Sequence, residues 1–127
     1  MNGYITNIEE KTIENQYFRQ VLYTGQHAQL VVMSLNPQED IGEEVHEIVD
    51  QFLRIEAGEA KVIMNGEEQM VKEGGAFVVP AGSKHNVVNV SSKNPLKLYT
   101  VYSPPHHKDG TIHKTKQDAQ TDESDHI

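Results

Sequence analysis

The chain has 127 residues and a mass of 14.3 kDa, which predicts one small domain and excludes a two-domain enzyme. Its 11 Lys and Arg against 19 Asp and Glu give a net charge of −8, so binding to nucleic acid or to an anionic membrane surface is not expected. Cysteine is absent, which excludes disulfides and thiolate ligands. Neither a secretion signal nor an apolar run near the ~20 residues of a membrane span is visible, so we expect a cytoplasmic protein.

The chain divides into three parts. Residues 1–16 mix polar side chains with isolated isoleucines, a pattern compatible with a short helix or an edge strand. Residues 17–103 consist of short β-forming runs separated by turn residues. The predicted strands are 17–24, 28–35, 43–49, 51–57, 60–65, 67–73, 76–80, 85–91 and 96–103. Short strands at this regular spacing are typical of an all-β sandwich or barrel.

The sharpest turn signal is the dipeptide Asn65-Gly66 between two of these runs. Both central residues of a type I′ turn need positive φ, which Asn and Gly tolerate best. The dipeptide therefore predicts a tight β-hairpin.

Residues 104–127 form a C-terminal extension without a core-forming pattern. It contains His106, His107 and His113, which we expect at the surface because they follow two prolines in a polar segment. We expect residues 104–116 to pack across the barrel surface. Residues 117–127 are an acidic tail, predicted to be mobile unless a partner orders it and dispensable for folding.

Glu44 and His46 are the first candidates for chemistry. They are two residues apart on a predicted strand, so their side chains project from one face, as two ligands of a single ion must. Gln51 reaches the same side only if residues 47–50 make a turn or bulge that resets the alternation. The alternative is a charged, solvated hairpin in which His46 is an ordinary exposed residue.

A downstream segment, residues 74–89, makes an exposed, non-functional His46 the less favoured interpretation. It fits the second motif of the cupin superfamily, G(X)5PXG(X)2H(X)3N, at every fixed position. These positions are Gly74, Pro80, Gly82, His85 and Asn89. The first cupin motif ends HXH(X)3–4E(X)6G, and the chain matches its second half through His46, Gln51 and Gly58, with Gln in the Glu place and Glu44 in the first His place.

The resemblance covers about residues 40–103 and is closest to small bacterial single-domain cupins, often labelled phosphomannose isomerase-like. It implies a double-stranded β-helix, or jelly-roll, barrel. It also implies one divalent metal, Fe, Mn, Ni, Co or Zn. The implied ligands are Glu44, His46, Gln51 and His85, in place of three histidines and a glutamate. The alternative is a cupin barrel that binds no metal and has no catalytic activity, because an amide oxygen is a weak metal ligand.

The resemblance favours a metal-dependent enzyme of dioxygenase type that acts on a small oxygen-rich molecule. Glu44, the only carboxylate of the set, would either bind the ion or act as general base. The alternatives are a sugar or sugar-phosphate isomerase-like enzyme and a non-catalytic cupin that binds a small ligand. A phosphosugar enzyme needs basic side chains near the phosphate, and only Lys84, Lys61 and Lys97 are plausible.

We also expect a homodimer. Small barrels have exposed strand edges, and cupins commonly cover theirs by pairing N-terminal strands between subunits. The segment Tyr17–Tyr23 is the candidate for this pairing.

Overall fold

The structure, a computed structural model, describes residues 2–125, which form two short helices and ten strands. The helices are α1 (Ile8–Glu14) and α2 (Lys116–Thr121). The strands are β1 (Arg19–Thr24), β2 (Gln29–Leu35), β3 (Glu44–Val45), β4 (Asp50–Ala57), β5 (Glu59–Met64), β6 (Glu67–Lys72), β7 (Ala76–Val79), β8 (Lys84–Asn89), β9 (Leu96–Ser103) and β10 (Ile112–His113). Each of the nine predicted runs overlaps one strand, and β10 is an addition.

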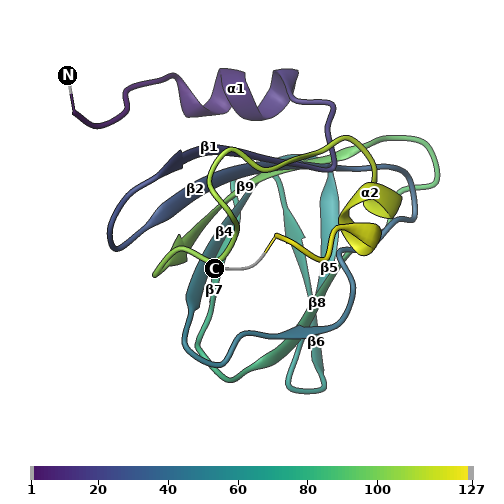
Figure 1. The fold of residues 1–127 in the computed structure, drawn as a ribbon. Coiled ribbons are helices and arrows are strands. Elements are labelled where there is room, and N and C mark those ends of the chain that lie inside the picture. Colours follow the sequence, from purple (N-terminus) through teal and green to yellow (C-terminus); the bar gives the residue numbers. More distant parts are fainter. Residues whose placement is uncertain (1, 126–127) are drawn as a thin grey trace.

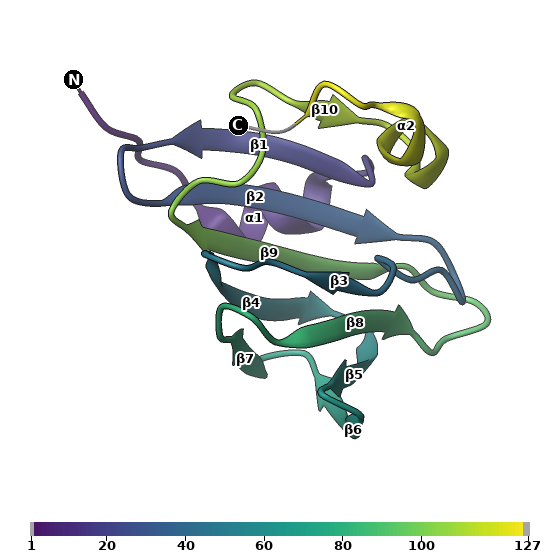
Figure 2. The ribbon, with the colours of Figure 1, turned by 60° about the horizontal axis from the view of Figure 1, so that its bottom comes forward.

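The strands form two antiparallel sheets (Figures 1 and 2). The larger has the order β10-β1-β2-β9-β4-β7, and the smaller has the order β3-β8-β5-β6. Strands far apart in the sequence are therefore neighbours, as β2 and β9 are over their whole length. This crossing pattern is that of a jelly roll, which confirms the predicted fold class.

The core lies between the two sheets and is built by strand alternation. Six large side chains of the larger sheet are fully enclosed: Met33, Leu35, Leu53, Ile55, Leu96 and Leu98. Each contributes roughly 1.5–3 kcal/mol by burial. Gln51 shares the inner face with Leu53 and Ile55, as the alternation of β4 predicts. A polar side chain is thereby carried into the barrel interior.

Two turns need their glycines. Asn65 and Gly66 have φ of 50° and 85° and join paired residues Met64 and Glu67, so the predicted two-residue hairpin is confirmed. At Gly58, φ is 94°, and a Cβ would lie 3.0 Å from the carbonyl oxygen of Pro95. Only glycine fits there without strain.

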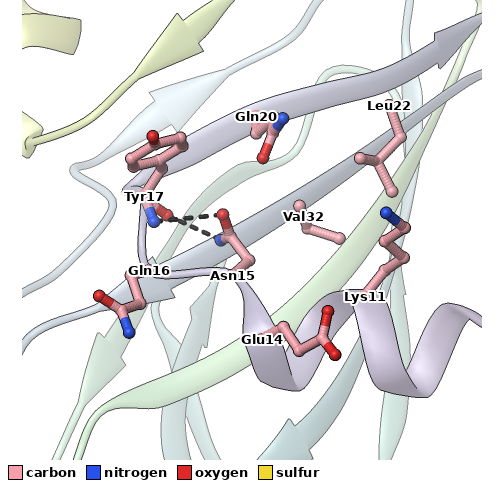
Figure 3. Close-up of a pocket in the computed structure, with 8 residues that line it drawn as sticks. All are labelled: Lys11, Glu14, Asn15, Gln16, Tyr17, Gln20, Leu22 and Val32. Atoms are coloured by element: carbon pink, nitrogen blue, oxygen red, sulfur yellow. Dashed lines mark hydrogen bonds between the residues drawn. The ribbon is translucent and has the colours of Figure 1, made fainter.

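Helix α1 resolves the open question about the first 16 residues. Asn7 caps it by accepting a hydrogen bond from Glu10 N at 3.0 Å. The helix packs on the larger sheet against β2, β4 and β9. Between α1 and the start of β1 is a hollow of about 340 Å³, whose wall includes Asn15, bonded to the backbone of Tyr17 (Figure 3).

Within residues 2–125, no helix is long and apolar enough to cross a membrane.

The C-terminal extension departs from the prediction of a mobile tail. Residues 116–121 are helical, and Asp125 is 5% exposed. The chain returns over β1, where the backbone of Phe18 and Val21 bonds to residues 114 and 111, and β10 pairs with Arg19 and Gln20. The prediction that residues 117–125 are mobile was wrong, because polar contacts hold this segment and such contacts leave no apolar pattern in the sequence. That the segment is dispensable for folding stays a prediction. Residues 126 and 127 lie outside the described part of the chain.

Candidate metal centre

Glu44 and His46 come together as their spacing predicts. Glu44 lies in β3, opposite His85 of β8, and His46 follows directly after the strand. His46 Nε2 donates a hydrogen bond to Glu44 Oε2 at 3.1 Å. His46 is only 8% exposed, which excludes the alternative of an ordinary surface histidine.

His85 stands beside this pair. Its ring centroid is 5.3 Å from that of His46, and the residue is 5% exposed. Its Nδ1 lies 3.1 Å from the carbonyl oxygen of Ser83. A carbonyl only accepts, so Nδ1 carries the proton and the lone pair of neutral His85 is on Nε2. A backbone carbonyl that fixes the ring in this way is a usual support for a metal-binding histidine.

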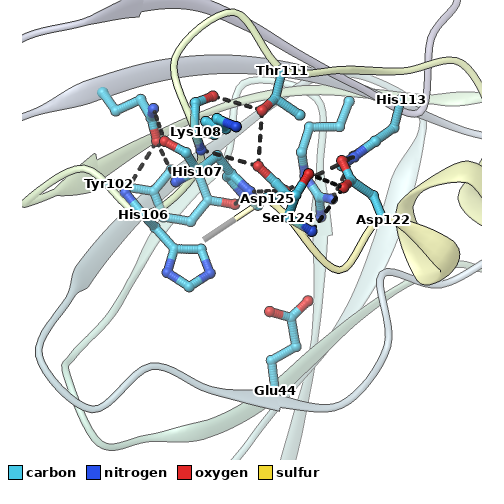
Figure 4. A network of polar contacts seen from close by, with 12 residues as sticks. Glu44, Tyr102, His106, His107, Lys108, Thr111, His113, Asp122, Ser124 and Asp125 are labelled. Atoms are coloured by element: carbon cyan, nitrogen blue, oxygen red, sulfur yellow. Dashed lines mark hydrogen bonds and ion pairs between the residues drawn. The ribbon is translucent and has the colours of Figure 1, made fainter. Parts of the chain in front are cut away.

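His106 is the member of the cluster that sequence reasoning missed. Its ring centroid is 4.2 Å from that of His46. One ligand atom each from Glu44, His46 and His106 lie within 4.8 Å of one another. Figure 4 shows the His106 ring and the Glu44 carboxylate on the same side of a polar network. A histidine from the C-terminal extension thus joins two residues of the cupin motif.

Gln51 occupies the barrel interior and is 3% exposed. Its Nε2 donates to Thr100 Oγ1 at 3.0 Å, and Thr100 Oγ1 in turn donates to the carbonyl oxygen of Phe52 at 2.8 Å. These bonds fix the amide so that its oxygen is the free end. Within the described chain that buried Oε1 has no hydrogen-bond partner. Its lone pairs are therefore not used by the protein, as is expected of an oxygen that binds a cation.

The donor set suits a divalent transition metal. Two or three imidazoles and one carboxylate are the ligands of non-haem iron sites and of many Mn, Ni, Co and Zn sites. Burial alone raises the pKa of Glu44, but the hydrogen bond from His46 and the charges of His46, Arg19 and His85 outweigh it, so the pKa lies below its usual value. Glu44 is therefore ionised at neutral pH, as a metal ligand must be.

A second polar network supports His106. Tyr102 stacks on the His106 ring at 5.5 Å, and its hydroxyl lies 3.1 Å from His107 Nε2. His107 Nδ1 lies 2.7 Å from Asp125 Oδ2. Burial lowers the pKa of His107 despite the opposing hydrogen bond to Asp125, so the ring is neutral, donates from Nδ1 and accepts from the Tyr102 hydroxyl. Burial also raises the pKa of Tyr102 well above its usual range, which keeps that hydroxyl protonated.

The expectation that the C-terminal histidines lie at the surface was wrong. His107 and His113 are 4% and 3% exposed, and His106 is partly buried. His113 Nε2 lies 2.9 Å from Asp122 Oδ2, so a second histidine–aspartate contact fastens the same segment. In the sequence, only the composition of this segment, three histidines followed by several acids, could have indicated that these histidines are buried. The segment has no apolar repeat typical of a strand or a helix.

A cavity of about 230 Å³ adjoins the cluster. Its wall includes Glu44, His106 and His107 together with two basic side chains, Arg19 and Lys116. None of the three lysines considered for a phosphate is among the residues of this wall. Lys84 is exposed and pairs with Glu43, Lys97 bonds to the backbone of Asn15, and Lys61 lines a different hollow with residues of β6.

Comparisons with known proteins agree with this geometry. A family model described as "Cupin domain" matches residues 31–102. The uncharacterised protein YrkC of Bacillus subtilis is 48% identical over 122 residues, covering 91% of this chain and 65% of YrkC. An uncharacterised protein of Acanthamoeba polyphaga mimivirus is 45% identical over 113 residues, covering 86% of this chain and 70% of its own. This chain thus spans about two thirds of the length of these curated relatives.

A solved structure extends the likeness to three dimensions. The crystal structure of BH2720 from Bacillus halodurans is 43% identical to this chain, and the likeness covers 92% of each chain with a TM-score of 0.90. The match therefore includes segments beyond residues 31–102.

Proposed function

The chain belongs to the cupin family, and we propose that it is a metal-dependent enzyme of dioxygenase type acting on a small oxygen-rich molecule. The observation that carries the proposal is the convergence of Glu44, His46 and His106 within 4.8 Å beside a cavity of small-molecule size. His85, next to His46, is the further imidazole of the set, and Gln51 offers an amide oxygen.

The chemistry of the donor atoms suggests which residues would bind the ion and which would accept a proton. Glu44, His46 and His106, whose ligand atoms lie within 4.8 Å of one another, would hold one divalent ion, with His85 beside His46 as a further donor. When bound, the ion supplies Lewis acidity and, if it is iron, redox chemistry. Glu44 is the only carboxylate among these donors, so a carboxylate released from the ion would be the proton acceptor at this end of the cavity. In a dioxygenase reaction that cleaves a carbon–carbon bond, both atoms of dioxygen enter the organic substrate and the substrate itself supplies the four electrons, so no external reductant is required.

Protein groups around the ion would position substrate and exclude water. Tyr102 keeps its proton and holds the His106 ring by stacking. The segment that ends at Asp125 runs beside β1 (Figure 2) and contributes residues such as Asp122 and Asp125 to the cavity wall. Residues far from the cupin motif thus form part of the wall that a ligand would contact.

Metal content tests the first step. The purified protein, equilibrated with Fe(II) or Zn(II) and desalted, should retain about one ion per chain. His46→Ala and His106→Ala should each weaken binding at least tenfold, since each removes one nitrogen donor. His27→Ala is the matched control, because His27 is exposed, and it should bind as the parent does. Equal retention by all four proteins would refute the site.

Catalysis needs a separate test. Oxygen uptake by the Fe(II)-loaded protein should rise with a substrate drawn from small enols, diols and carboxylates, and His46→Ala should abolish the rise. Interconversion of a sugar or sugar phosphate without oxygen uptake would favour the isomerase alternative. Tight binding of a small molecule with neither reaction would leave a non-catalytic ligand-binding cupin.

We further propose a homodimer in the cytoplasm. The expected pairing strand is partly occupied, since residues 111–114 already cover Phe18–Val21 of the same chain. Strands β6 and β7 end the two sheets and carry the exposed Met70 and Val78. Unpaired strand edges with exposed apolar side chains favour association. Light scattering at micromolar concentration should therefore give twice the monomer mass.

A further inference from the structure

Arg19 is a buried cation in the wall of the cavity beside the metal-binding cluster. It is 6% exposed and begins β1 opposite His113. One guanidinium nitrogen, Nη1, lies 3.2 Å from His113 Nδ1, and the group lies 5.2 Å above the ring of Phe18. The guanidinium also interacts with the phenol of Tyr102.

Among the described residues, Arg19 forms no ion pair with a carboxylate. The three acids in the same cavity wall have other partners. Glu44 contacts His46, Asp122 contacts His113, and Asp125 contacts His107. The Nε of Arg19 is buried without a hydrogen-bond partner in the described chain. Burial of a guanidinium without a carboxylate is costly, so an additional anion at this place would stabilise it.

Binding of a metal would increase that need. Lys116, the other base of the wall, is already paired with Asp40, so when the ion binds, Arg19 is the base of the wall that has no carboxylate partner among the described residues. Glu44, whose charge acts on Arg19 in the metal-free site, would then be shared with the ion. One guanidinium without a carboxylate of its own matches one carboxylate of a ligand, which it can bind through two hydrogen bonds.

We propose that Arg19 binds the anionic group of the ligand and that the ligand is a small monocarboxylate. This inference rests on the proposed function in one respect, since the ion would share the charge of Glu44 that otherwise acts on Arg19. A cavity of about 230 Å³ holds roughly eight water volumes of ~30 Å³. The cavity therefore has room for a small monocarboxylate, with its carboxylate at Arg19 and its remaining oxygens toward Glu44 and His106.

Calorimetry on the Zn(II)-loaded full chain tests the proposal with pyruvate, neutral hydroxyacetone and inorganic phosphate as probes. Pyruvate should bind at least tenfold more tightly than hydroxyacetone and more tightly than phosphate. Arg19→Gln should weaken pyruvate binding at least tenfold while Zn(II) affinity does not fall. Arg54→Gln is the matched control, because Arg54 lies on the outer side of β4 and pairs with Glu56. It should leave pyruvate binding unchanged.

The outcomes separate this inference from the metal proposal. Retained zinc with equal binding of pyruvate and hydroxyacetone, or with equal pyruvate binding by Arg19→Gln, would overturn the role of Arg19. Tighter phosphate binding would overturn the carboxylate assignment, and so would no pyruvate binding at all. Arg19-dependent pyruvate binding without zinc retention would support the anion site and refute the metal site. If Arg19→Gln does not fold, Arg19→Lys keeps the charge, and at least threefold weaker pyruvate binding is expected.

Discussion

Asp125 fastens the C-terminal segment to the barrel, and its removal should destabilise the fold. Its carboxylate accepts hydrogen bonds from His107 Nδ1 at 2.7 Å, Thr111 Oγ1 at 2.8 Å and Lys108 N at 3.0 Å. Bonds to a charged acceptor contribute about 1.5–3 kcal/mol each, and they are not additive. Asp125→Ala also leaves the buried His107 donor unpaired. We expect a loss of about 3–5 kcal/mol from a total stability of ~5–15 kcal/mol.

Urea and thermal unfolding measure this loss. At neutral pH, Asp125→Ala should lower the melting temperature by roughly 10–20 °C. Asp125→Asn, which keeps the shape without the charge, should fall between Asp125→Ala and the parent. The control is Glu123→Ala, an exposed acid of the same segment, with an expected change within about 0.5 kcal/mol. A chain ending after Lys116 should lose at least as much stability as Asp125→Ala, contrary to the expectation from sequence.

The same contact predicts a loss of stability in acid. Burial raises the pKa of Asp125, but the bonds from His107, Thr111 and Lys108 outweigh it and hold that pKa well below its usual range. The pKa of His107 is also lowered, chiefly by burial. In both cases the unfolded chain binds a proton that the folded chain does not, so stability falls as pH drops below about 6.5 for His107 and again below about 3.9 for Asp125.

Asp125→Ala should remove the part of the stability loss that the parent shows below about pH 3.9, because that part comes from protonation of Asp125. If the parent and Asp125→Ala unfold at the same urea concentration at pH 7, and lose stability in parallel between pH 5 and pH 3, the anchoring role argued for Asp125 is wrong.

Three further changes test other parts of the structure. Gln51→Glu should tighten Zn(II) binding measured by competition with a chelator, because it adds a negative oxygen where Oε1 lacks a partner; unchanged affinity would place the amide outside the ligand set. Leu53→Ala should cost about 2–5 kcal/mol in urea unfolding, since Leu53 is fully enclosed. Gly58→Ala should cost about 1–3 kcal/mol, because φ is positive and Pro95 O is close; a neutral result would show that the turn relaxes.

Local sequence determined the strands and much of the site. The alternation that carries Gln51, Leu53 and Ile55 to one face is a property of a single strand, and the Asn65-Gly66 hairpin needs only its own dihedral angles. The two cupin motifs locate Glu44, His46 and His85, because the fixed spacing within each motif identifies the residues, and the pairing of β3 with β8 then sets Glu44 opposite His85. Where the driving interaction is local, the pattern is visible in the chain itself.

Tertiary structure alone decided the rest of the cavity. His106 and Asp125 come from a polar segment without periodicity, and Arg19 is one charged residue in an ordinary strand pattern. They meet Glu44 because the chain returns over β1 after β9 and is held there by polar contacts such as His107–Asp125. Hydrogen bonds between residues 18 to 94 positions apart depend on exact distances in the folded state, and sequence patterns do not encode them.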